Sequence, residues 1–125
     1  MAVDEQVVTF PIQAAPSLTF SDQALSEDGT ITIDSALIDA AGWIAVHSDN
    51  EGAPGPVIAT YPLTRGVNRN IVIELDAEEA GARVFPMLHY DTGEAGVYEF
   101  GAVEGADGPV TVGGNVVVAP LNIGE

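Results

Sequence analysis

The fold class is decided by a short apolar run: residues 43–47 read Trp-Ile-Ala-Val-His. Residues 84–90, Val-Phe-Pro-Met-Leu-His-Tyr, repeat this pattern of apolar side chains at successive positions. Because neighbouring side chains of a strand point to opposite faces, such runs are typical of central strands in a closed or two-layered structure. Pro86 lacks the N–H that a ladder needs, so we expect this strand to be bulged or edge-exposed at Pro86.

Other strands have one solvated face. Residues 30–34, Thr-Ile-Thr-Ile-Asp, and residues 70–75, Asn-Ile-Val-Ile-Glu-Leu, alternate apolar and polar side chains. Turn residues separate further predicted strands at residues 17–20, 57–61, 97–100, 110–112 and 116–121. We therefore predict an all-β chain, an immunoglobulin-like or cupredoxin-like β-sandwich of about seven to nine short strands with Greek-key connections.

Helix is nearly absent from this pattern. Residues 76–81, Asp-Ala-Glu-Glu-Ala-Gly, predict one helical turn that ends at the glycine. Residues 34–41 are a second helix candidate, although we expect them to continue the preceding strand into a loop.

The length of 125 residues fits one domain, preceded by an arm. Residues 6–12 are strand-like but are separated from the rest by Ala14, Ala15 and Pro16. We predict an arm at residues 1–15 and a β-sandwich domain at residues 16–125. The arm docks either as an extra edge strand of its own domain or on a neighbour's sheet edge, which repeated head to tail gives a filament. The apolar residues available for such self-association are Val7, Val8, Phe10 and Ile12.

The charge balance restricts the partners. Nineteen Asp and Glu stand against three Arg and no Lys, for a formal net charge of -16. Binding of phosphate backbones or anionic headgroups depends on clusters of Lys and Arg, so we expect neither nucleic acid nor a membrane surface as partner. A chain of this charge spreads its carboxylates, is screened by salt, or binds cations.

Missing residue types and segments exclude further classes of site. The chain has no Cys, which excludes disulfides, thiolate metal sites and the blue-copper ligand set. Without Lys there is no Schiff-base chemistry. We find no signal peptide and no apolar run long enough to span a membrane, so the protein is either cytosolic or exported with its leader outside this sequence.

Several blocks in a fixed order resemble a known but uncharacterised domain, which recurs, often in tandem, in predicted secreted and cell-surface proteins of bacteria and archaea. The blocks are residues 42–47, 49–58, 87–93, 98–100 and 107–110, and the resemblance covers residues 17–121. It implies an exported β-sandwich at the cell surface, and it transfers no functional residue. Many members are richer in Asp and Asn after the equivalent of His89, where this chain has Asp-Thr-Gly-Glu-Ala-Gly at residues 91–96.

Two acidic loops are candidate cation sites. Asp91, Glu94 and Glu99 lie on a glycine-containing turn and offer the hard oxygen ligands that Ca²⁺ prefers. Asp49 and Asn50 would complete the ligand set if both loops lie at the same end of the sandwich. A hairpin tip needs glycines regardless of any ion, so the alternative is an ordinary turn. We predict no obligatory cofactor, with Ca²⁺ as the candidate ion.

A second candidate site is a soft one. His47, Met87 and His89 are the nitrogen and sulfur donors suited to copper. The alternative is structural, because a histidine at the end of a core strand commonly caps a loop by hydrogen bonding and methionine is an ordinary core residue.

No catalytic motif is present. Ser and Thr occur only in strand or turn contexts, without a nucleophile-elbow or phosphate-loop pattern, so we predict that the protein is not an enzyme. We expect Arg65 and Arg69 to pair with nearby carboxylates or to contact a neighbouring subunit, and Trp43 to lie in the core.

Taken together, these features predict a non-catalytic, extracellular structural or adhesive subunit that assembles through its N-terminal strand. The alternative is a monomeric module that binds Ca²⁺, copper or a glycan through the loops around residues 49–51 and 91–99.

Overall fold

The computed structural model describes residues 15–92, 94–98, 100 and 106–124. Within them lie ten strands and one helix. The elements are β2 (Ser17–Thr19), β3 (Gln23–Ala24), β4 (Thr30–Ile38), β5 (Gly42–Asn50), β6 (Ala53–Leu63), β7 (Gly66–Glu74), α1 (Ala77–Ala80), β8 (Arg83–Tyr90), β9 (Thr111–Val112), β10 (Asn115–Val116) and β11 (Leu121–Gly124).

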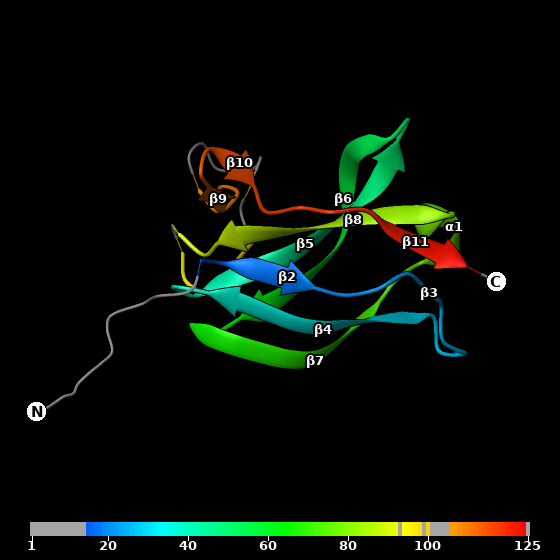
Figure 1. Ribbon diagram of the computed structural model, residues 1–125, viewed down its shortest axis with the longest axis horizontal. Helices are drawn as coiled ribbons and strands as arrows, with labels where there is room; N and C mark the ends of the chain where they lie inside the picture. Colours follow the sequence, from blue (N-terminus) through cyan, green and yellow to red (C-terminus); the bar gives the residue numbers. More distant parts are fainter. Residues whose placement is uncertain (1–14, 93, 99, 101–105, 125) are drawn as a thin grey trace, which may run out of the picture.

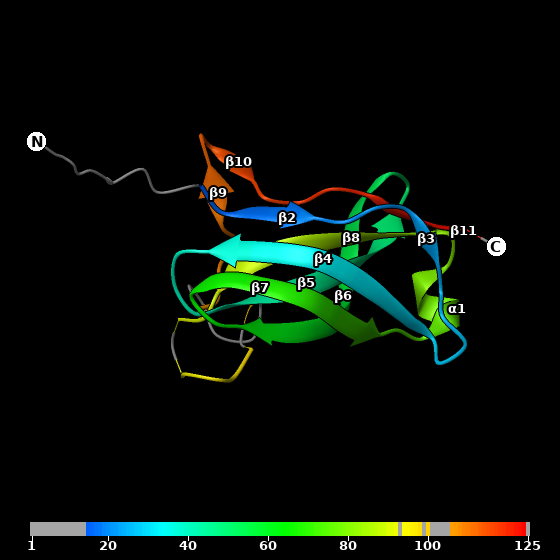
Figure 2. The same cartoon turned by 60° about the horizontal axis from the view of Figure 1, so that its bottom comes forward.

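The strands form two layers. One sheet has the order β2-β4-β7, and the other has the order β3-β11-β8-β5-β6, while β9 and β10 form a separate two-stranded hairpin. Figure 2 shows β4 and β7 in front of β5, β6 and β8, and Figure 1 shows the same layers from another side. From β2 to β8 the chain changes sheet at every connection except the one between β5 and β6. The predicted all-β, sandwich-like fold is confirmed. The ten strands exceed the expected seven to nine because the count includes three strands of only two residues, β3, β9 and β10.

The hydrophobic core lies between the layers, where the alternating strands place their isoleucines. Ile31 and Ile33 of β4 pair in register with Ile73 and Ile71 of β7, and all four side chains are buried. Thr30, Thr32 and Glu74 take the intervening positions outside this core. The solvated-face prediction for these strands is therefore confirmed. The second sheet contributes its own inner face to this core, through Ile44, Val46, Val84, Leu88 and Leu121.

β5 and β8 are the neighbouring central strands that the apolar runs predicted. Their antiparallel ladder pairs Gly42 with Tyr90 and continues to Ser48 opposite Val84. Six consecutive residues of each strand are buried, on both faces of the sheet. The outer face carries six side chains that are not part of the core between the layers, namely Trp43, Ala45, His47, Phe85, Met87 and His89. Trp43 is buried as expected, although on this outer face and not in the core between the layers.

The predicted irregularity at Pro86 is wrong. Pro86 lies opposite Val46 in an unbroken β5–β8 ladder, and β8 is a central strand. The Leu88 N–H bonds to the Val117 carbonyl on the other side of β8, and alternate residues of a strand direct their N–H groups to the same side. The nitrogen of Pro86 therefore faces the same side of β8 as the Leu88 N–H. It lies between the Leu88–Val117 hydrogen bond and the pairing of Val84 with β11, so no ladder bond is lost. The register shifts lie instead between β5 and β6, on either side of His47.

The helical prediction is confirmed as one turn. Asp76 caps α1, because its carboxylate accepts hydrogen bonds from the N–H groups of Glu78 and Glu79, and Gly81 ends it. The second candidate, residues 34–41, continues β4 as far as Ile38 and then bends, as expected. In the described part of the chain α1 is the sole helix, and four residues are too few to cross a membrane.

Two predicted strands are wrong. Val97 and Tyr98 belong to no strand, and Tyr98 packs its ring on the outer face instead. The strand expected at residues 116–121 is divided, because β10 ends at Val116 and β11 begins after Pro120. The predicted arm falls almost wholly on residues 1–14, which lie outside the described residues, so the predicted domain boundaries stay predictions.

A single glycine tests the close approach of β4, β5 and β8. A Cβ atom on Gly42 would meet the carbonyl oxygen of His89 and the Cδ1 atom of Ile38, whereas one on Gly108 would meet nothing within 4 Å. We predict that Gly42→Ala lowers the free energy of unfolding by about 1–3 kcal/mol, as overpacking does. Urea denaturation measures this loss, and Gly108→Ala is the matched control. Equal stability of the two variants would contradict the packing at Gly42.

Candidate functional site

Among the described residues, side chains able to bind a ligand are most concentrated on the outer face of the β5–β8 pair. His89 lies opposite Trp43, Met87 opposite Ala45, and His47 opposite Phe85. We call these six residues the histidine cluster. His89 is fully buried and His47 is 7% exposed, although both side chains point away from the core between the layers. The structure thus brings together the three residues predicted as a soft metal site, on two adjacent strands.

Backbone carbonyls fix the protonation of both imidazoles. His47 Nδ1 lies 2.7 Å from the carbonyl oxygen of Gly55, and His89 Nδ1 lies 2.7 Å from that of Asp107. A carbonyl oxygen only accepts, so each Nδ1 carries the hydrogen and donates it. In the neutral ring the Nε2 atom then carries the free lone pair.

Each of these carbonyls is positioned by local structure. The β5–β6 register shifts beside His47 and the close approach of Gly55 to Ser48 bring the first carbonyl to the ring. The second is held by a reciprocal pair: Thr92 N–H donates to Asp107 Oδ1, and Asp107 N–H donates to Thr92 Oγ1, both at 2.7 Å. The loop after β8 is thereby tied to the segment that caps His89.

Aromatic rings surround His89. The rings of His47 and His89 are nearly parallel, with centroids 6.0 Å apart. Tyr98 and Phe100 contact His89 edge-on at centroid distances of 5.6 and 4.9 Å, and Tyr98 also contacts Trp43 at 5.7 Å. The imidazoles therefore lie in an apolar, aromatic environment.

Unpartnered polar atoms gather in this environment. Within the part of the chain that the structure describes, five buried side-chain nitrogen or oxygen atoms have no hydrogen-bond partner. Four of them belong to the histidine cluster and its Tyr98 contact: Trp43 Nε1, His47 Nε2, His89 Nε2 and Tyr98 Oη. The fifth is Asp91 Oδ1. An unpaired buried polar group costs about 1–3 kcal/mol, so this concentration needs an explanation.

Burial shifts the titration of two of these groups. Desolvation lowers the pKa of His89, and the backbone hydrogen bond to Asp107 opposes that shift in part. Desolvation and the nearby Asp107 carboxylate raise the pKa of Tyr98 to about 12. At neutral pH the cluster therefore presents a neutral His89 imidazole and a protonated phenol.

The acidic loops are not brought together. Asp49 and Asn50 end β5, whereas Asp91 follows Tyr90, which pairs with Gly42 at the start of β5. At a rise of about 3.3 Å per residue, the two loops lie roughly 20 Å apart along the strand. Asp49 Oδ1 accepts from Gly52 N–H and Asp91 Oδ2 from Gly96 N–H, each at 2.8 Å, as in ordinary turns. Glu99 lies outside the described residues, and no group of three His, Asp or Glu that could hold a metal occurs within them.

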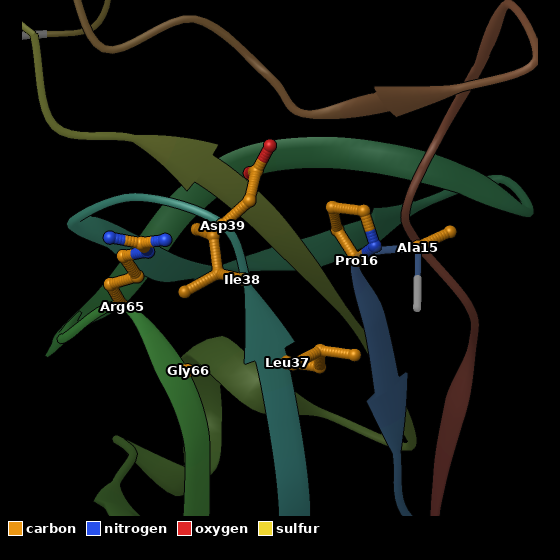
Figure 3. Close-up of a pocket in the computed structure, with 7 residues that line it drawn as sticks. All are labelled: Ala15, Pro16, Leu37, Ile38, Asp39, Arg65 and Gly66. Atoms are coloured by element: carbon orange, nitrogen blue, oxygen red, sulfur yellow. The ribbon is translucent and has the colours of Figure 1, made fainter. Parts of the chain in front are cut away.

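A cavity of about 470 Å³ lies elsewhere, at the end of the three-stranded sheet. Figure 3 shows its lining, which comes from the residues before β2, the end of β4 and the start of β7. Asp39 and Arg65 are its charged lining residues, and Asp39 also accepts a hydrogen bond from the Tyr90 hydroxyl. The lining holds no nucleophile paired with a base.

Arg65 and Arg69 have no ion-pair partner among the described residues, so the predicted intrachain pairing is not found there. Arg83 donates from Nε to Asn122 Oδ1 at 3.0 Å. Both unpaired arginines are exposed, beside and on β7.

Sequence reasoning missed the aromatic and backbone partners of the histidines. Tyr98 was assigned to a strand and Phe100 to its end, and Asp107 was given no role. The only sequence signal for these partners is that Asp, Thr and Tyr residues follow the strand that ends near His89. That signal does not show which of them contact the histidine.

Comparison with known proteins places the chain in a family. A family model described as a domain of unknown function, DUF7282, matches residues 16–123. The chain belongs to this family. The resemblance to an uncharacterised cell-surface domain is thereby confirmed, and the family supplies no site residues.

Two curated relatives carry a similar segment. Over 109 residues the chain is 30% identical to cell surface glycoprotein 2 of Haloarcula hispanica, which covers 86% of the chain and 11% of that protein. Over 115 residues it is 32% identical to cell surface glycoprotein 1 of the same organism, covering 90% of the chain and 12% of that protein. The chain therefore spans little more than a tenth of these relatives. No solved structure matches.

The lowered pKa of His89 makes a testable contribution to stability. Below about pH 6.5 the unfolded imidazole binds a proton that the folded one does not, so this stability is present above that pH and is lost as pH falls toward the folded pKa. We predict that His89→Gln removes this loss, so that its free energy of unfolding falls less than that of the wild type between pH 7.5 and 5.5. Urea denaturation across this range measures it, and the carboxylates common to both proteins cancel. Parallel curves would contradict the burial of a neutral His89.

Proposed function

We propose that this chain is a non-catalytic structural domain of a cell-surface assembly. One observation carries the proposal: nearly the whole chain matches a domain-sized segment of much longer cell surface glycoproteins. A domain repeated or embedded in such proteins serves as a building unit of the surface. The described residues support a non-catalytic role, because the cavity beside β7 is lined by Asp39 and Arg65 without a nucleophile or a histidine.

Charge restricts how copies of the domain meet. At a net charge of -16, two copies repel one another over most of their surfaces. Two of the three arginines, Arg65 and Arg69, lie exposed beside and on β7. A contact that includes this edge brings cations to an acidic partner, which favours it over other orientations.

The sheet edges also differ in how well each can pair with a further strand. β6 is one edge of the five-stranded sheet, and Pro54, Pro56 and Pro62 remove N–H donors along it. β7 is one edge of the three-stranded sheet, is nine residues long and has no proline. The remaining edge strands of these two sheets, β2 and β3, have only three and two residues. Two of its valines, Val67 and Val72, are 55% and 53% exposed. β7 is therefore the edge suited to accept another strand.

The proposed occupant is the N-terminal segment of a second copy. Residues 7–12 contain four large apolar side chains, and Asp4 and Glu5 precede them. A strand with acidic residues at one end complements an edge that carries Arg65 and Arg69. Repeated head to tail, this addition produces a filament or a surface layer.

We predict that association increases with salt and depends on both surfaces. Screening shortens the range of the acidic repulsion to about 3 Å at 1 M salt, so the average mass from light scattering should rise with NaCl and with protein concentration. Replacing Val8 and Phe10 by Asp should keep the protein monomeric. Arg69→Glu should weaken association by about tenfold, an amount equivalent to 1.4 kcal/mol.

Arg83→Glu is the matched control, because it makes the same charge change away from β7. Equal effects of the two arginine variants would assign the loss to net charge and contradict the β7 contact. A wild-type chain that stays monomeric at molar salt would refute assembly, and stoichiometric Ca²⁺ or glycan uptake by that monomer would favour the alternative, a ligand-binding module.

A further inference from the structure

The unpartnered atoms of the histidine cluster lead beyond a structural role. His47 and His89 both donate from Nδ1 to a backbone carbonyl at 2.7 Å, and both Nε2 atoms are buried without a partner among the described residues. A histidine whose second nitrogen is held in this way is the arrangement found in metal-ligating histidines, because the carbonyl fixes the tautomer and the ring orientation. One such ring is unremarkable for a core histidine. Two on adjacent strands, with centroids 6.0 Å apart, form a preorganised pair.

A third donor residue shares the outer face with the two histidines. Met87 lies on β8 midway between His89 and Phe85, and Phe85 is the register partner of His47. Met87 is largely buried, and its partner across the ladder is the small residue Ala45. Two imidazoles and one thioether therefore come from neighbouring positions on one face of two paired strands.

The donor types select the metal. Two imidazole nitrogens and a thioether, without a thiolate or a carboxylate ligand, form a soft set. Ca²⁺ and Mg²⁺ require several oxygen ligands, and structural Zn²⁺ requires four ligands in most sites, so neither suits the cluster. Cu(I) is soft, binds imidazole and thioether, and accepts low coordination numbers.

The surroundings favour the same ion. Tyr98 and Phe100 contact the His89 ring, and Trp43 contacts Tyr98, so aromatic groups surround His89. The Nε2 atoms of both histidines are buried. Cu(II) prefers tetragonal nitrogen and oxygen ligands, which this apolar environment does not supply. A single positive charge is easier to bury than a double one, and aromatic faces attract cations. The fully buried Asp107, whose carbonyl caps His89, brings a negative charge close to the site.

We propose that His47, Met87 and His89 bind one Cu(I) ion. The backbone carbonyls of Gly55 and Asp107 position the two imidazoles, and the aromatic groups exclude water and stabilise the reduced ion. The site is independent of assembly at β7, since it lies on the other sheet.

Anaerobic titration of the purified chain with Cu(I), in competition with a chromophoric Cu(I) chelator, tests the proposal. The wild type should take up one equivalent. His47→Gln and His89→Gln should each weaken binding by at least about 100-fold, since even outer partners of a metal site contribute 10–100-fold. Met87→Leu, which keeps the volume but removes the sulfur, should weaken it by about tenfold. Val72→Ala, at an exposed position of β7 on the other sheet, is the control, with unchanged affinity expected.

Nitrogen-15 NMR gives a second readout that does not depend on the variants folding. The chain has two histidines, so all imidazole nitrogen signals come from His47 and His89, and each histidine variant that folds assigns its own set. Addition of Cu(I) should shift both Nε2 resonances and leave both Nδ1 atoms protonated. Uptake that persists unchanged in the histidine variants, or resonances that do not move, would overturn the proposal and leave water as the partner of the Nε2 atoms. Equal affinity for Zn²⁺ would overturn the selectivity for Cu(I).

Discussion

The ladder between β5 and β8 is the constraint on which the rest of this structure depends. Its seven residue pairs place Ile44, Val46 and Leu88 in the core between the sheets. The same pairing places His47, Met87 and His89 on the opposite face. One backbone interaction therefore determines both the core and the donor cluster, because the side-chain period of a strand is two residues and a shift of one residue would exchange the faces. Gly42 has no side chain where β4, β5 and β8 approach most closely.

The two faces of the five-stranded sheet differ in chemistry. The buried residues of the inner face are aliphatic, with Tyr61 and Tyr90 packed against them, and they stabilise the sandwich by burial. The outer face buries polar atoms of Trp43, His47, His89 and Tyr98 under aromatic cover, an arrangement that costs stability unless a partner is bound. Natural sequences retain such costs where a function requires them.

The sequence alone predicted what depends on local pattern. Alternation identified β4 and β7, continuous apolar runs identified β5 and β8, and the Asp76 and Gly81 signals located α1. Pro86 was misjudged because the cost of a missing N–H depends on what lies across the strand, which is a tertiary fact. The strand assigned to residues 97–100 failed because Tyr98 packs against Trp43 and His89, contacts that no local pattern encodes. The donor residues of the candidate site were identified by type, whereas their tautomers follow from the Gly55 and Asp107 carbonyls and required the fold.

The parallel pairing of β3 with β11 has a mechanical consequence. In Figures 1 and 2 the described chain begins near one end of the sandwich and finishes at the opposite end, where β3 and β11 run side by side in the same direction. Tension applied between the two ends of the domain therefore loads these backbone hydrogen bonds in shear, so that they must break together instead of peeling apart one at a time. In the assembly proposed above, units of this kind would resist stretching along the chain without any covalent crosslink.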